Sequence, residues 1–309
     1  MAMESVLEGN VVTKLCEPVK LPRMVKIRQR FDETHLTPEE IPGIVRRQLA
    51  RPEIEKGILP GMQVAITCGS RGVANVALIT KAIADFVKER GAFPFVFPAM
   101  GSHGGATAEG QRKILEGYGV TEEFVGCPIR ATMETVEIGR LEDGMPVYMD
   151  KYAHDADAII LSGRIKAHTA FRGPHESGLM KMAVIGMGKQ HGAETVHESG
   201  FINMGALMPR VAKVVLGHAN VVAAVGMIEN AFDQTYKIAA LTKEEIWTEE
   251  PKLLLEAKSK MGRIWFDAID ELVVDRIGKD ISGDGMDPNV TGRFACADSA
   301  SGGIQVKRI

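Results

Sequence analysis

Aromatic side chains, paired cysteines and long apolar runs are all scarce in this chain of 309 residues. Aromatic residues make up 6% of the chain, its net charge is −3, and no basic stripe accompanies the aromatics. This composition argues against a nucleic-acid-binding surface. No apolar run approaches the ~20 residues that a membrane-spanning helix needs. The cysteines are far apart without paired spacing, which indicates reduced thiols. They are Cys16, Cys68, Cys127 and Cys296.

Several common cofactor and metal motifs are also missing. The chain has neither a Gly-x-Gly-x-x-Gly motif nor a Walker loop, which disfavours a freely exchanging dinucleotide. It has no His-x-Glu-x-x-His or Cys-x-x-Cys pattern, so a common zinc site has no direct support. Residues 1–10 lack the charged-then-apolar pattern of a secretory signal. Together with the unpaired cysteines, these absences predict a cytoplasmic protein.

Strand-like and helix-like segments alternate along the chain, which predicts a two-domain α/β fold. Length alone favours roughly two domains of ~150 residues. Short apolar runs that lead into glycine-rich turns and amphipathic segments predict a mostly parallel sheet flanked by helices. These runs are Met62–Thr67, Phe93–Met100, Ala158–Leu161 and Val221–Met227. We place the domain boundary near residue 255, which divides the chain into 1–255 and 256–309.

The second, smaller α/β domain begins within a charged segment. Thr242 and Glu245 form a capping-box pattern that predicts a connecting helix over 242–261. Residues 271–277 and 305–309 alternate like strands. Because the domain ends in mid-pattern, we expect it to be truncated.

Histidines gather in one window of the sequence. Half of the eight histidines lie between Ser162 and Gly200, directly after the apolar run 158–161. His103 stands in a similar place, on a glycine-rich turn after the run 93–100. The carboxyl ends of parallel strands meet at the edge of a sheet where ligands bind, so these positions favour proton transfer or metal binding over packing. The four histidines in the window are His168, His175, His191 and His197.

Two of the loops after strands carry candidate binding groups. Ser70 and Arg71 stand at an expected helix start, where backbone N–H groups and a guanidinium suit a phosphate or carboxylate. The alternative for this loop is a tight turn with a solvated arginine. The loop with His103 and Thr107 is either a ligand loop, whose glycines permit close approach, or an ordinary surface turn.

A third, longer loop carries Lys181. This lysine is either an ordinary surface charge or, where burial lowers its pKa, a nucleophile or covalent anchor. His197 can donate a neutral imidazole nitrogen to a metal ion. His175 and His191 are less constrained, and solvated side chains explain them equally well.

The same loops match longer patterns in a fixed order. Residues 101–107 follow Gly-x-His-x-x-x-Thr, and residues 177–186 follow Ser-Gly-x-x-Lys-x-x-x-x-Gly. His197 then follows Lys181, and the turn at residues 69–71 precedes both patterns. Each motif alone is weakly specific. In this order they resemble the nickel-pincer-nucleotide-dependent lactate racemases and their LarA-like relatives.

The resemblance implies a racemase or epimerase that inverts the α-carbon of a 2-hydroxy acid by reversible hydride transfer. The cofactor is a nickel-pincer nucleotide, a Ni(II) pyridinium-3,5-bisthiocarboxylic acid mononucleotide, held by the domain 1–255. Lys181 would tether it covalently and His197 would ligate the nickel. His103 and His168 would act as acid and base on opposite faces of the substrate. The remaining cofactor contacts would come from Ser70, Arg71, Thr107, Ser177 and Gly178.

Departures from the family pattern lie around the substrate. Cys68 stands where the family usually has aspartate, and Gly104 stands where an arginine is common. The interval 168–181 is longer than in lactate racemases. These changes disfavour lactate itself and favour another 2-hydroxy acid, such as a larger sugar acid. Arg71 would bind either the substrate carboxylate or the cofactor phosphate, and Lys279 would reach the substrate from the second domain.

Two other functions stay open at this point. One is a hydrolase or lyase with an ordinary metal ion held by His103, His168 and His197. The other is a non-catalytic protein that binds or carries the nickel cofactor. For the racemase we expect a small 2-hydroxy acid and cofactor-biosynthesis proteins as partners, no nucleic acid or membrane, and a homodimer as a candidate assembly.

Overall fold

The computed structural model describes residues 11–18, 20, 23–279 and 281–309. The chain divides into two compact units, Met1–Arg30 and Phe31–Ile309. The described part of the first unit contains the helix α2 (Val11–Cys16). The expected absence of a signal pattern concerns residues 1–10, which lie outside the described residues.

The second unit is built on a five-stranded sheet with the order β2-β1-β5-β6-β7. The strands β2, β1, β5 and β6 pair in parallel, and β7 pairs antiparallel with β6. A mostly parallel sheet in an α/β chain was the predicted fold class, and the structure confirms it. The strands are β1 Gln63–Cys68, β2 Phe93–Pro98, β5 Ala158–Arg164, β6 Val221–Glu229 and β7 Thr235–Leu241.

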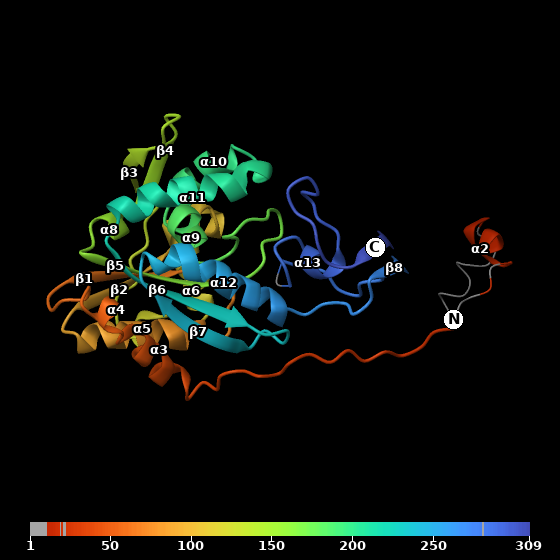
Figure 1. Cartoon of the computed structure of the whole chain (residues 1–309), viewed down its shortest axis with the longest axis horizontal. Coiled ribbons are helices and arrows are strands. Elements are labelled where there is room, and N and C mark those ends of the chain that lie inside the picture. The colour runs from red at the N-terminus through yellow and green to blue at the C-terminus, as the bar shows by residue number, and fades with distance from the viewer. Residues whose placement is uncertain (1–10, 19, 21–22, 280) are drawn as a thin grey trace. The chain divides into compact units, whose positions relative to one another are not determined.

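Both faces of this sheet are covered, which explains why its strands read as continuous apolar runs. Along β5, Ile159 and Leu161 point into one hydrophobic core, whereas Ala158 and Ile160 point into the other. This alternation is the two-residue period of a strand. Figure 1 shows helices on the two sides of the sheet. Those packed over the second core are α3 Ile41–Leu49, α4 Pro52–Glu55 and α5 Val76–Glu89.

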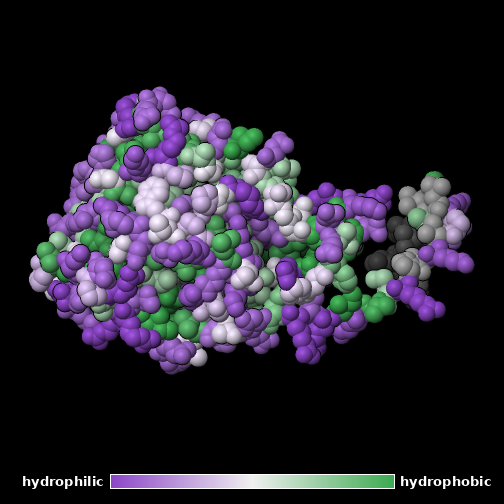
Figure 2. All heavy atoms as spheres, in the orientation of Figure 1, coloured by the Kyte–Doolittle hydropathy of each residue, from purple (hydrophilic) through white to green (hydrophobic). Residues whose placement is uncertain are grey.

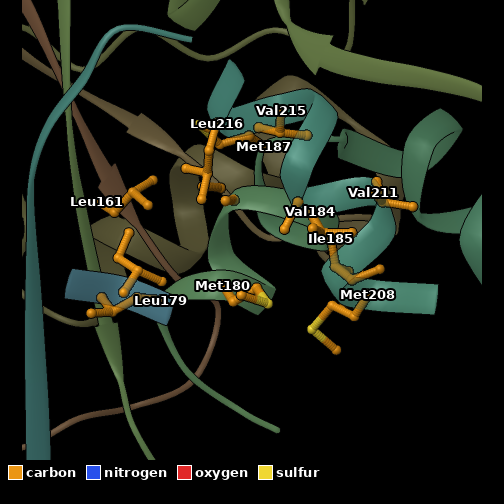
Figure 3. Close-up of a cluster of buried hydrophobic side chains, with 14 of the residues drawn as sticks. Leu161, Leu179, Met180, Val184, Ile185, Met187, Met208, Val211, Val215 and Leu216 are labelled. Carbon is orange, nitrogen blue, oxygen red and sulfur yellow. The ribbon is translucent and has the colours of Figure 1, made fainter. Parts of the chain in front are cut away.

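The first core is formed by helices that follow β5 and by a small hairpin. Figure 3 shows its apolar side chains, among them Leu179 and Met180 of α9, Val184 and Ile185 of η2, and Val215 of α11. The helices are α9 Leu179–Lys181, the π-helical turn η2 Met182–Gly186, α10 Lys189–His197 and α11 Phe201–His218. The hairpin consists of the antiparallel strands β3 Thr135–Arg140 and β4 Pro146–Asp150.

Shorter elements connect these parts. A 3-10 turn, η1 (Gly104–Ala106), leads from the loop after β2 into the next helix. Three helices lie between β2 and β5: α6 Ala108–Gly117, α7 Glu122–Val125 and α8 Lys151–His154.

The helix α12 (Glu245–Lys260) starts with the predicted capping box. The Thr242 N–H donates to Glu245 Oε2 at 2.9 Å, and the Glu245 N–H donates to Thr242 Oγ1 at 3.2 Å. Both bonds satisfy N–H groups that a helix start would otherwise leave unpaired. The helix runs across residue 255, and the domain division proposed there stays a prediction.

Beyond α12 the chain forms two short parallel strands, β8 (Ala268–Glu271) and β9 (Gln305–Arg308), and the helix α13 (Pro288–Thr291). The strand predicted at 271–277 is wrong, because pairing with β9 ends at Glu271. Of the apolar residues in this segment, Val273 and Ile277 are exposed.

Hydrophilic side chains cover most of the face seen in Figure 2, and apolar ones are scattered among them. Among the described residues, no helix is both long and apolar enough to span a membrane.

A buried ion pair joins α10 to the hairpin. Lys189 is fully buried, and its Nζ lies 3.4 Å from Asp150 Oδ2. The same Nζ donates to the carbonyl of Pro98 at 2.8 Å and to Gln111 Oε1 at 2.6 Å. Asp150 Oδ1 accepts from two backbone N–H groups at the start of α8. Burial raises the pKa of Asp150 and lowers the pKa of Lys189, so each charge depends on the other.

The substitution Lys189→Met is expected to destabilise the fold by about 3–5 kcal/mol, because it leaves the Asp150 charge buried without its partner. Urea unfolding of both proteins measures the loss. The control is Lys213→Met on the exposed side of α11, where the expected change is within about 0.5 kcal/mol. Equal losses in the two variants would show that the buried pair carries no particular weight.

Candidate active site

The predicted loops meet in one cleft at the carboxyl ends of β1, β2, β5 and β6. Two adjoining cavities of about 250 and 570 Å³ make up this cleft. The first is lined by the loop residues 69–71 and 99–103, and the second by residues 281–283 of the C-terminal segment. The residues that line both cavities are Arg71, Val73, Arg164, Lys166, Ser177 and Lys181.

His103 faces the first cavity from the loop after β2. Its Nδ1 hydrogen-bonds to Ser70 Oγ, and the carbonyl of Ser70 accepts from the Tyr118 hydroxyl at 2.8 Å. Burial, followed by the charges of Arg71 and Lys181, lowers the pKa of His103. The imidazole is therefore neutral near pH 7, as a proton acceptor must be.

The glycine at position 104 is required by the backbone geometry of this loop. Gly104 has φ +68°, and a Cβ there would lie 2.7 Å from the backbone N of Gln111. No arginine can occupy this position without moving α6, which explains the departure from the family pattern in physical terms.

Gln111 links the His103 loop to the buried lysine below it. Its Nε2 donates to the carbonyl of Gly101 at 2.8 Å and to the carbonyl of His103 at 3.2 Å. Its Oε1 accepts from Lys189. The loop backbone is thus held by a side chain whose amide is itself fixed by a buried cation.

Thr107 belongs to the loop and not to the cleft lining. Its Oγ1 accepts from the Gly110 N–H at 3.0 Å and donates to the carbonyl of Gly104 at 3.2 Å. These bonds make Thr107 the N-cap of α6, as its position before the helix indicates.

The central contact of the cleft joins Lys181 to His168, whose Nζ and Nε2 lie 2.7 Å apart. The Ala170 N–H donates to His168 Nδ1 at 3.0 Å, so the proton of the neutral ring is on Nε2. An Nε2–H group can donate only to an uncharged amine, so this pattern is complete with neutral Lys181. Burial, followed by the charges of Arg71 and Lys166, lowers the pKa of Lys181 to about 8. Burial, followed by the charge of Lys181, lowers the pKa of His168 to about 2.

The backbone of His168 is fixed from several sides. Its N–H donates to Glu176 Oε2 at 2.7 Å, and its carbonyl accepts from Arg172 at 2.7 Å. Glu176 is buried and also accepts from Lys258 at 2.7 Å. The His168 ring lies against Phe171, with 4.2 Å between the ring centroids. The ring is therefore pre-positioned in the cleft.

His197 lines the first cavity from the last turn of α10. Burial, followed by the charge of Lys181, lowers the pKa of His197, which leaves a neutral nitrogen free to bind a metal ion. Within residues 11–18, 20, 23–279 and 281–309, no three His, Cys, Asp or Glu side chains converge as metal ligands.

Two further cations, Arg164 and Lys166, line the cleft and were not predicted from the sequence. Lys166 Nζ lies 3.7 Å from Asp287, and burial, followed by the charge of Arg164, lowers its pKa. Arg164 is paired with Glu229. Both cations follow the apolar part of β5, and this position after a strand is the only sequence signal that they carry. The predicted substrate residue Lys279 lines the second cavity.

Three other residues singled out in the sequence have packing roles. His175 is buried, and its Nε2 bonds to the carbonyl of Ile246 at 3.1 Å. His191 stacks on Tyr148 with 3.9 Å between ring centroids. Cys68 lines the first cavity, and burial raises the pKa of its thiol to about 12, so the thiol stays protonated.

Comparisons with known proteins address the fold and the family of the chain. No curated protein matches the chain. Among solved structures, the lactate racemase apoprotein from Thermoanaerobacterium thermosaccharolyticum has the same fold, with a TM-score of 0.57 and 16% identity. The match covers 74% of this chain and 58% of that one. A family model described as the lactate racemase N-terminal domain matches residues 24–208. Because this match spans more than half of the sequence, the chain belongs to the lactate racemase (LarA-like) family.

Proposed function

We propose that this protein is an isomerase, a racemase or epimerase of a 2-hydroxy acid that uses a nickel-pincer nucleotide tethered to Lys181. The observation that carries the proposal is the half-buried amine of Lys181. It lines both cavities and is hydrogen-bonded to His168. A lysine with a lowered pKa supplies a neutral nitrogen that can form a covalent bond near physiological pH.

The residues of the cleft fit such a cofactor. The adjoining cavities offer the volume, and Arg71, Lys166 and Lys279 offer positive charge for a phosphate and a carboxylate. His197 offers one imidazole nitrogen, and the lack of a three-residue ligand cluster among the described residues suits a metal that brings its other donors with it. When bound, the cofactor would accept a hydride from the α-carbon of the substrate and return it.

The two histidines can divide the proton transfers between them. When His103 Nδ1–H donates to Ser70 Oγ, its Nε2 keeps a lone pair that accepts the hydroxyl proton of the substrate. His168 has the opposite arrangement. Its Nδ1 accepts a hydrogen bond from the Ala170 N–H, so the proton of the ring is on Nε2. One side chain accepts and the other donates, and they line different cavities with Lys181 common to both. This arrangement suits inversion, which needs a base and an acid on different sides.

Bonding of Lys181 would also change the charges in the cleft. When Lys181 is protonated, its charge adds to the larger effect of burial in lowering the pKa of His103, His168 and His197. Conversion of the amine to an amide-type nitrogen would remove that charge, so the part of each pKa lowering that comes from Lys181 would be lost while the part that comes from burial stays. It also releases His168 Nε2 from its hydrogen bond to the amine. Tethering would therefore prepare the histidines for proton transfer.

The substrate that we favour is larger than lactate, such as a sugar acid. The 570 Å³ cavity and its polar lining by Lys279, Ser282 and Asp233 support a substrate with additional hydroxyl groups. All four cysteines have free thiols, which supports a cytoplasmic location. Cofactor-biosynthesis proteins as partners and a homodimeric assembly remain part of the proposal.

The chain co-expressed with cofactor-making enzymes is expected to carry an adduct of mononucleotide size, seen by intact mass. Lys181→Ala removes it, because the proposed covalent bond is to this amine, whereas the exposed Lys213→Ala keeps it. An unchanged wild-type mass together with bound zinc would instead favour an ordinary metal enzyme.

The nickel ligand is tested in the same preparation. His197→Ala is expected to keep the adduct and lose nickel, measured by mass spectrometry and metal analysis. Loss of both in equal measure would assign His197 a structural role.

Lys181 is expected to react with acetic anhydride with a midpoint near pH 8, because only the neutral amine reacts and its pKa is lowered to about 8. Below that pH the ammonium form dominates and the reaction falls. The exposed Lys213 in the same digest serves as the reference. Equal midpoints for the two lysines would contradict a desolvated amine.

His103→Ala and His168→Ala are each expected to reduce turnover about 10²–10⁴-fold, the usual loss of a general acid or base. The measurement is epimer formation and deuterium retention across a panel of 2-hydroxy acids. Unchanged adduct mass in both variants shows that the cofactor is in place. Full activity in both would rule out the two-histidine proposal, and wild-type protein with an adduct but no turnover would indicate a cofactor carrier.

A further inference from the structure

The helix α12 lies outside the matched family domain, yet it contacts the loop that bears Lys181. His175 bonds to the carbonyl of Ile246, and Lys258 pairs with Glu176. Glu250 reaches the first turn of α9 from the same helix. Three side-chain contacts thus anchor residues 175–180 to one helix.

Glu250 is the most unusual of these contacts. Its side chain is buried, and Oε1 accepts from the Leu179 N–H at 2.6 Å while Oε2 accepts from the Met180 N–H at 3.1 Å. Among the described residues, no cation forms an ion pair with it. These two N–H groups are at the start of a helical run, where no internal acceptor exists, and Lys181 is the next residue.

The chain leaves room for this carboxylate at position 178. A Cβ added to Gly178 would lie 1.9 Å from Glu250 Oε1. Any side chain there would displace the carboxylate, so this contact requires glycine at position 178.

The carboxylate is costly for the fold. Burial raises the pKa of Glu250 to about 7, although the N–H groups of Met180 and Leu179 oppose this rise. A buried carboxyl group without a cation partner loses hydration, and its two hydrogen bonds to the backbone offset that cost only in part. What the carboxylate adds is a fixed direction for the turn that follows, which begins with Lys181 and continues into the π-helical turn η2.

We propose that Glu250 is a positioning residue for Lys181. Its carboxylate holds the first turn of α9. That turn then holds the Lys181 amine against His168 and between the two cavities. The inference rests on the proposed function only for what Lys181 does, because the position of the amine is measurable in the chain without cofactor.

The test follows the pH dependence of Lys181 acetylation by acetic anhydride in the full chain, with Lys213 as internal reference. Glu250→Ala and Gly178→Ala break the same contact from opposite sides. Both are expected to move the Lys181 midpoint upward by about one unit or more, since a loosened turn lets the amine reach water and regain its ordinary pKa near 10.4.

The near-isosteric Glu250→Gln keeps one acceptor oxygen and is expected to give a midpoint between those of wild type and Glu250→Ala. The control is Glu256→Gln on the same helix, which removes an ion pair with Lys237 and should leave the Lys181 midpoint unchanged. Thermal unfolding of each variant separates loss of stability from movement of the amine.

An unchanged Lys181 midpoint in folded Glu250→Gln and Gly178→Ala would overturn the proposal, whatever the loss in stability. Co-expression with the cofactor-making enzymes adds a second readout, an adduct yield that falls in Glu250→Ala and not in Glu256→Gln. If wild-type protein takes no adduct, the proposed function fails while the acetylation result still decides the role of Glu250.

Discussion

The properties of the cleft depend on the amine of Lys181, which is kept largely out of water. Lys181 stands where two cavities join, its charge disfavoured by burial and by neighbouring cations, and its nitrogen bonded to His168. The three histidines in and around the cleft have lowered pKa values partly because of this lysine. A bond at Lys181 would therefore alter the whole site, since one change of charge reaches every group that could move a proton or bind a metal.

The sheet explains how residues far apart in sequence meet. The parallel strands β1, β2 and β5 end at one edge, and the loops that follow them supply Ser70, His103 and His168. Since the strands are rigid and buried on both faces, the loops start from fixed points. The remaining freedom is removed by local contacts, of which the Ser70–His103 bond is one.

Buried polar groups behind the cleft supply the precision that the sheet alone does not. Gln111 and Lys189 hold the loop of His103, and Glu176 holds the backbone of His168. Glu250 holds the turn before Lys181 in the same manner. Burial of each of these groups costs free energy of desolvation. Hydrogen bonds to the backbone offset this cost, and the same bonds fix the position of that backbone. The candidate active site is thus held through hydrogen bonds to main-chain carbonyl and N–H groups.

The amino-acid sequence by itself determined the α/β class, the strand runs and the loops that hold His103 and Lys181, because hydrophobic periodicity and glycine-rich turns are local signals. It did not reveal the supporting roles of Glu250 and Lys189, or the contribution of Lys166 to the cleft. A glutamate on a charged helix and a lysine after a glycine read as surface residues, and only packing decides that they are buried. The pKa of Lys181 was decided in the same way, because desolvation and nearby charges arise only when distant segments are brought together.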